Sequence, residues 1–201
     1  MLTKTGSCER LMLWVDGVGG FLLCTDEDLV IGQAVPECKI DIPILGDLKR
    51  SHLRIKRCND AHLLTPLGPV EMAGRTVKAK TMLRNGQTLC LGGTVQLKYT
   101  IPHPLSTSAR LDITSRHRTQ PWSDAILLVA DTIVLGPKRN SHIVCPDWEH
   151  ELILFRRDGE WFCRTAGNIE VDGQVFYTEA PLERDCRISG EDCSMTLESI
   201  Y

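Results

Sequence analysis

Apolar residues alternate with polar ones along several short stretches of the chain. Between Leu89 and Ile101, the odd positions other than Gly93 are apolar, and polar residues such as Gln96, Lys98 and Thr100 occupy even ones. The same period of two recurs over residues 52–56. This period marks a β-strand with one buried face, and no stretch carries a helical stripe. The pattern therefore predicts an all-β fold.

Turn signals separate these stretches at short intervals. Each consists of a glycine after an aspartate, an asparagine or another glycine: Asp16-Gly17, Gly19-Gly20, Asn85-Gly86, Gly92-Gly93, Asp158-Gly159 and Asp172-Gly173. Such pairs favour the tight turns that join neighbouring strands. Many short strands with this punctuation are typical of a β-sandwich or barrel.

Two parts of the chain resemble each other. The segment "VIGQ" at 30–33 matches "VLGP" at 134–137, and "VEMAGR" at 70–75 matches "IEVDGQ" at 169–174. Counted from Gly92 and from Gly190, apolar residues fall at the third, fifth and seventh positions in both parts. Because a glycine, a spacing and a strand phase all repeat, we predict two copies of one β module.

The stretch between the copies is rich in proline, serine, threonine and arginine. It is typical of an inter-domain connection, so we predict a module over 10–104, a linker over 105–121 and a second module over 122–201. The linker keeps Leu105, Leu111 and Ile113, and we therefore expect it to lie partly against a module.

Composition narrows the class of partner. Of the 201 residues, 42 % are apolar and 24 % charged, the ordinary balance of a globular protein, and the formal net charge is −3. We expect neither nucleic acid nor membrane as a partner, so any phosphate recognition must come from a local basic cluster. The apolar run Ala125 to Ala130 is too short to cross a bilayer, and no export signal is visible. The expected location is the cytoplasm.

The sequence contains no recognisable motif for catalysis or metal binding. The nine cysteines show neither CxxC nor zinc-ligand spacing, which favours small buried apolar residues over a redox or metal role. Cys58 with His62 and Cys145 with His150 are neighbours in sequence only. No GxSxG, HExxH or phosphate-binding glycine loop is present. We expect a binding protein without enzyme activity, cofactor or metal.

The first copy resembles a forkhead-associated (FHA) domain. The matching segments are Gly32-Gln33, "GDLKRSHLRI" at 46–55, Ala73-Gly74 and "LRNGQTLCLGGTVQLKY" at 83–99. The second copy is similar but more eroded, and the whole arrangement resembles tandem proteins of this family in planctomycete-type bacteria. The resemblance implies two tandem FHA-like β-sandwich modules, the second degenerate, in a family whose loops bind phosphothreonine peptides.

The resemblance also implies a site in the first copy. It places Lys49 at the family's phosphate-binding serine, Arg50 next to it and Ser51 at the spacer position. Gln33 stands where the family has an arginine that supports the phosphate site. Gly32 and His52 would brace the loop.

Other positions depart from the family pattern. The asparagine that holds the ligand backbone has no match in residues 65–74, and the later Asn-Gly is Ala73-Gly74. In the second copy Glu149 and Glu151 flank His150, which makes the local charge negative.

Two functions follow. In the first, the cationic loop of Lys49, Arg50 and Ser51 binds a phosphorylated or acidic segment of a signalling partner, with phosphothreonine as the ligand. In the alternative, the protein is a scaffold for protein–protein contact that has lost phosphate dependence, as Gln33, Lys49 and Ala73 suggest.

Overall fold

The computed structural model describes residues 10–36, 40–103 and 105–200. All of the regular secondary structure in these residues is β-strand, which confirms the predicted all-β class. None of the described residues belongs to a helix long and apolar enough to cross a membrane.

The described strands follow one another in two runs. Those up to residue 100 are β1 (Arg10–Val15), β2 (Gly19–Cys24), β3 (Asp28–Gln33), β4 (Ile42–Leu45), β5 (Leu53–Cys58), β6 (Ala61–Pro66), β7 (Val70–Met72), β8 (Arg75–Thr76), β9 (Thr81–Met82), β10 (Thr88–Leu91) and β11 (Val95–Thr100). The later ones are β12 (Ala109–Ile113), β13 (Arg118–Thr119), β14 (Ala125–Leu128), β15 (Thr132–Gly136), β16 (Ile143–Val144), β17 (Leu152–Arg157), β18 (Glu160–Val171), β19 (Gln174–Leu182), β20 (Cys186–Ser189) and β21 (Ser194–Ile200).

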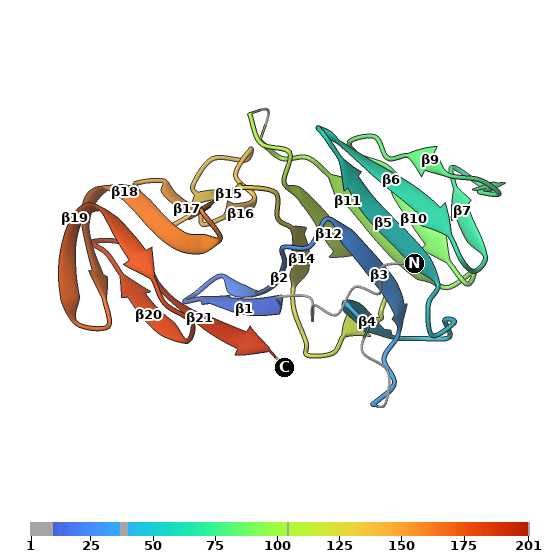
Figure 1. The fold of residues 1–201 in the computed structure, drawn as a ribbon, viewed down its shortest axis with the longest axis horizontal. Coiled ribbons are helices and arrows are strands. Elements are labelled where there is room, and N and C mark those ends of the chain that lie inside the picture. Colours follow the sequence, from blue (N-terminus) through green and yellow to red (C-terminus); the bar gives the residue numbers. More distant parts are fainter. Residues whose placement is uncertain (1–9, 37–39, 104, 201) are drawn as a thin grey trace.

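One long sheet runs through the whole molecule. In the described part of the chain its order is β16-β15-β17-β18-β20-β21-β1-β2-β14-β12-β11-β10-β7-β8, with β19 beside β18. A second sheet, β13-β4-β3-β5-β6-β9, covers one end. Figure 1 shows a sandwich at each end of the molecule, with β1, β2 and β14 between them.

The strand pairing repeats in the two sandwiches. β3 pairs in parallel with β4 and antiparallel with β5, and β15 pairs in the same way with β16 and β17. Gly32 lies opposite Pro43, and Gly136 lies opposite Val144. The two glycines therefore occupy equivalent places at the ends of equivalent strands.

The following hairpins match residue by residue. Arg54 pairs with Thr65 and Ile153 with Arg164, so equivalent residues differ by 99 in number on both strands (54 and 153, 65 and 164). The same difference relates the turn at Gly74 to the turn at Gly173, where φ is +72° and +84°. Such positive angles favour glycine at both positions.

The first strand of each repeat is exchanged between the sandwiches. Leu111 of β12 pairs with Tyr99, and Leu13 of β1 pairs with Leu197. Tyr99 and Leu197 are equivalent, because Tyr99 lies seven residues after Gly92, Leu197 lies seven residues after Gly190, and both side chains are buried. β1 therefore completes the second sandwich, and β12 completes the first.

This pairing cuts across the predicted boundaries. β1 falls within the segment predicted as the first module, yet it pairs with β21 at the other end of the chain. The segment 105–121, predicted as a linker, contains β12, which pairs with β11 and β14, and β13, which pairs with β4. Leu111 is fully buried, so this stretch is an integral part of the sheet.

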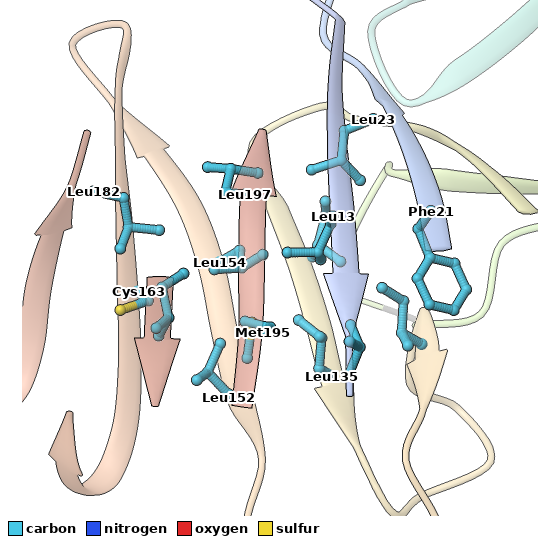
Figure 2. Close-up of a cluster of buried hydrophobic side chains, with 14 of the residues drawn as sticks. Leu13, Phe21, Leu23, Leu135, Leu152, Leu154, Cys163, Leu182, Met195 and Leu197 are labelled. Atoms are coloured by element: carbon cyan, nitrogen blue, oxygen red, sulfur yellow. The ribbon is translucent and has the colours of Figure 1, made fainter. Parts of the chain in front are cut away.

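The central strands β1, β2 and β14 form a wall with a core on each side. Side chains on one face join the core of the second sandwich: Leu11, Leu13, Val15, Phe21, Leu23, Ala125 and Leu127. Those on the other face join the core of the first sandwich: Met12, Leu22, Cys24, Ile126 and Leu128. Figure 2 shows Leu13, Phe21 and Leu23 together with side chains of the second sandwich. Burial on both faces explains why these strands are continuous apolar runs.

Several cysteines belong to these cores. Cys145, Cys163, Cys186 and Cys193 are buried and free of disulfides. Burial raises the pKa of Cys145 and of Cys163 to about 12, and that of Cys186 and of Cys193 to about 11. These thiols remain protonated at neutral pH, and the thiolate is the reactive form.

The shared wall predicts that the two sandwiches unfold together. Leu13→Ala should lower the free energy of unfolding of the whole chain by roughly 2–5 kcal/mol, because it opens a cavity in a fully buried position. Leu105→Ala is the control, since Leu105 is 91 % exposed. Urea unfolding followed by tryptophan fluorescence and far-UV circular dichroism should show one coincident transition. Two separate transitions, with Leu13→Ala shifting only one, would contradict the shared wall.

Stability should also depend on His62, which is buried against the Tyr99 hydroxyl. Burial, helped by the Arg57 charge, lowers the pKa of His62 from 6.5 to about 4. Between these pH values the unfolded chain binds a proton that the folded chain does not, so stability falls as pH is lowered from 6.5 to 4. The loss is on the order of 3 kcal/mol. Urea midpoints measured across this range should vary less in His62→Gln, and an unchanged slope would show that His62 does not titrate in this way.

Candidate functional site

The predicted cationic loop connects β4 to β5 at the end of the smaller sheet. Lys49, Arg50 and Ser51 are all exposed, while Leu48 and His52 on either side of them are buried. The two buried residues anchor the loop, and the three residues between them face solvent. The structure thus brings together the three residues that the sequence pattern proposed.

Gly32 is placed where β3 passes directly against this loop. A Cβ atom at Gly32 would lie 1.8 Å from the carbonyl oxygen of Arg50, closer than any side chain permits. The N–H of Gln33 donates a hydrogen bond of 3.0 Å to the carbonyl oxygen of Lys49. Glycine is therefore required for the close approach of strand and loop, and Gln33 lies beside the base of the loop.

His52 connects the loop to the segment between β6 and β7. Its Nδ1 accepts a hydrogen bond from the N–H of Lys49 at 3.1 Å, so Nε2 carries the proton and donates it to the carbonyl oxygen of Pro69 at 2.8 Å. The carbonyl oxygen of His52 accepts hydrogen bonds from the N–H groups of Leu67 and Gly68. These four bonds hold the loop in one conformation.

The exposed residues of the loop leave several donors open. Lys49 Nζ donates one hydrogen bond, to the carbonyl oxygen of Leu67 at 3.1 Å. Within the described ranges, no carboxylate pairs with Lys49 or Arg50, and the backbone N–H groups of Arg50 and Ser51 have no acceptor. Two cations, a hydroxyl and two amides are thus available to an anion.

The second copy has an equivalent loop, but a carboxylate of the chain itself occupies the backbone amides of that loop. Glu149 and His150 are equivalent to Arg50 and Ser51 by the difference of 99. The N–H groups of both donate to Oδ2 of Asp192, at 2.5 Å for Glu149 and 3.1 Å for His150. Desolvation opposes ionisation of Asp192, but these donors outweigh it and lower the pKa of this carboxyl group. The amide pair of this loop therefore binds an anion, supplied by the chain itself.

Among the described residues of the first copy, no carboxylate accepts from the equivalent amides. The spacing from Gly92 and Gly190 aligns Thr94 with Asp192 in sequence, although the two turns differ in length: Leu91 pairs with Val95 in the first copy, and Ser189 pairs with Ser194 in the second. Threonine carries no charge, and the donors of Arg50 and Ser51 stay open. The repeat in the sequence already aligns Thr94 with Asp192, but it does not reveal that this turn reaches the loop.

Other features of the second loop also differ from the first. Trp148, equivalent to Lys49, is buried, and Glu151, equivalent to His52, pairs with Lys138 at 3.1 Å. The loop thus lacks the cations of the first copy. Among the described residues, no group of three or more histidine, cysteine, aspartate or glutamate side chains is arranged to hold a metal ion.

Comparison with known proteins adds FHA domains as structural neighbours. No family model and no curated protein matches this sequence. The FHA domain of FhaA, solved in complex with the intracellular domain of Rv3910, has 23 % identity, covers 41 % of this chain and 92 % of its own, and gives a TM-score of 0.30. A structure from a study of phosphothreonine-dependent FHA interactions has 23 % identity, 42 % and 88 % coverage, and a TM-score of 0.30. The N-terminal FHA domain of EssC, a component of the bacterial type VII secretion apparatus, has 10 % identity, 94 % and 92 % coverage, and a TM-score of 0.26.

Proposed function

We propose that the first copy binds a phosphorylated segment of a partner protein, with phosphothreonine as its ligand, through the loop of Lys49, Arg50 and Ser51. The observation that carries this proposal is the difference between the two copies. In the second copy the Asp192 carboxylate occupies the amide pair of the loop, and in the first copy no described residue accepts from the equivalent pair.

The chemistry of the loop suits a phosphate group. Phosphothreonine carries a charge of about −1.5 to −2 at neutral pH and three acceptor oxygens. The guanidinium of Arg50 and the ammonium of Lys49 provide charge-assisted donors, and the Ser51 hydroxyl provides a neutral one. Gln33, beside the loop, offers a neutral amide to the peptide. Recognition of this kind requires no covalent chemistry, so we propose a binding module in cytoplasmic signalling.

The alternative is a scaffold that binds its partner without regard to phosphorylation. Two observations favour it. Lys49 Nζ already donates to the Leu67 carbonyl oxygen, and Gln33 replaces the charged arginine that the family pattern has at that position. In that case the loop would contact a partner through shape and neutral hydrogen bonds.

A phosphothreonine peptide library with unphosphorylated copies separates the two functions. We expect the intact protein to prefer the phosphorylated form at low salt, and the preference to fade as salt is raised. Lys49→Ala with Arg50→Ala should weaken binding by roughly ten- to a hundredfold and leave the melting temperature nearly unchanged, because exposed charges contribute little to folding. Lys138→Ala with Arg139→Ala removes the same charge from the second copy and should leave binding unchanged. Equal binding of both peptide forms at low salt would rule out phosphate-dependent binding and favour the scaffold function.

A single substitution in the turn between β10 and β11 provides a second test of the same function. Thr94→Asp places a carboxylate at the position that aligns in sequence with Asp192, so we expect it to occupy the amides of Arg50 and Ser51 and to abolish phosphopeptide binding. Thr94→Asn has nearly the same shape without the charge and should retain most of the binding. Titration calorimetry measures both. Unchanged affinity in Thr94→Asp would show that phosphate does not bind at these amides.

A further inference from the structure

The connection that follows the first strand of each repeat differs in length between the two copies. β1 joins β2 through residues 16–18, whereas β12 joins β14 through residues 114–124, which include β13. Both pairs of strands are antiparallel neighbours in the long sheet, so three residues are enough to connect them. The longer connection is therefore not needed to form the sandwich, and such connections are where binding residues often lie.

This connection is fixed against the first sandwich. β13 pairs with β4, and the N–H of Gln96 in β11 donates a hydrogen bond of 3.1 Å to the hydroxyl of Ser115. The same hydroxyl lies 2.9 Å from Nδ1 of His117. A Cβ atom added at Gly46 would lie 3.0 Å from Cδ2 of His117, so the ring packs directly against this glycine. The connection thus has a defined position on β4 and β11.

A shallow surface groove of about 390 Å³ lies on the connection. The residues that line it include Arg116, His117, Arg118 and Trp122, and we call it the basic groove. Trp122 is 47 % exposed, and its ring stacks on that of Trp14 with centroids 6.5 Å apart. The groove therefore combines cationic side chains with a fixed aromatic surface.

The charge of the basic groove is positive. Arg116 and Arg118 are exposed, and in the described part of the chain neither of them forms an ion pair. Asp124 is the carboxylate among the described lining residues, and its Oδ2 already accepts a hydrogen bond of 2.9 Å from the N–H of Gly20. Two guanidinium groups without an internal partner attract carboxylates of a ligand and can form charge-assisted hydrogen bonds with them.

The basic groove lies near the loop of Lys49, Arg50 and Ser51. Arg118 pairs with Leu45, which precedes Lys49 by four residues. Paired residues of antiparallel strands are about 5 Å apart, and an extended residue spans at most about 3.6 Å, so the Cα atoms of Arg118 and Lys49 lie within about 20 Å of each other. An extended peptide of about six residues covers that distance.

We propose that the basic groove binds acidic side chains of the same partner segment whose phosphothreonine occupies the loop. Arg116 and Arg118 would pair with aspartate or glutamate carboxylates within about six residues of the phosphothreonine, and the Trp122 ring would contact the aliphatic parts of these side chains. This proposal rests on the function proposed for the loop, because binding of the phosphate brings the acidic residues to the groove at high effective concentration.

The test uses the intact protein and phosphothreonine peptides of equal length and charge. Two peptides carry three glutamates within about six residues of the phosphothreonine, one before it and one after it, and a reference peptide carries them at least about twelve residues away. In calorimetry, one of the two near peptides should bind roughly three- to tenfold more tightly than the reference, because two or three exposed ion pairs add modest contributions. Raising the salt concentration should reduce this advantage.

A pair of double variants connects the advantage to the groove. Arg116→Ala with Arg118→Ala should remove the advantage and leave the affinity for the reference peptide unchanged, which also shows that the variant is folded. Lys138→Ala with Arg139→Ala removes the same charge from the second sandwich and should keep the advantage.

Backbone and indole resonances separate this proposal from the function of the loop. The amides of Arg50 and Ser51 report the loop, and the indole N–H of Trp122 reports the groove, so the favoured near peptide should shift all three. Equal affinity for near and distant glutamates while the two amides shift, or an advantage that survives in Arg116→Ala with Arg118→Ala, would overturn the groove proposal and leave the function of the loop intact. If the two amides respond to none of the phosphopeptides, the proposed function is wrong and the groove proposal is wrong with it.

Discussion

Burial of both faces of β1, β2 and β14 is the constraint on which the rest of the structure depends. Alternate side chains of these strands enter two different cores, so neither sandwich is complete without them. The parallel pairing of β2 with β14 joins the two halves into one sheet. Since apolar burial is the main favourable contribution to folding, the wall makes the stability of one half depend on the other.

The exchange of first strands follows from the same arrangement. β1 begins the chain and pairs with β21 at its end, while β12 lies between the repeats and pairs with β11. Each sandwich thus receives an edge of its sheet from the other repeat. This arrangement fixes the position of one sandwich relative to the other.

The two copies differ at two kinds of position, while the hairpins β5–β6 and β17–β18 keep the same pairing. At the loop, Thr94 and Arg50 in one copy are Asp192 and Glu149 in the other, which changes an open set of donors into one filled by an internal carboxylate. In the core, Tyr99 in one copy is Leu197 in the other, so the hydroxyl that meets His62 in the first sandwich has no counterpart in the second. Neither change disturbs the hairpins, because loop residues and the ends of the core can vary without altering strand register.

Much of this architecture could be predicted from the sequence. The alternation at 89–101, the glycine turns and the spacing from Gly92 and Gly190 correctly indicated strands, hairpins and a repeat. The exchange could not be predicted, because alternation shows which face of a strand is buried but not which strand it pairs with.

Prediction of the loop had a similar limit. The pattern around His52 indicated that Lys49, Arg50 and Ser51 form one exposed loop, and the structure places them together. Asp192 contacts the amides of Glu149 and His150, which lie 43 and 42 residues before it in the sequence. This contact depends on how two turns meet in space. No local pattern in the sequence reports such a contact.

The most direct measurement of the central claim is a phosphothreonine peptide titration followed by the backbone amide resonances of the intact protein. The amides of Arg50 and Ser51 should shift strongly and saturably, because they bind the phosphate. The amides of Glu149 and His150 should stay in place, because Asp192 already occupies them. Equal shifts in both loops, or shifts in neither, would contradict the claim that only the first copy keeps its anion site open.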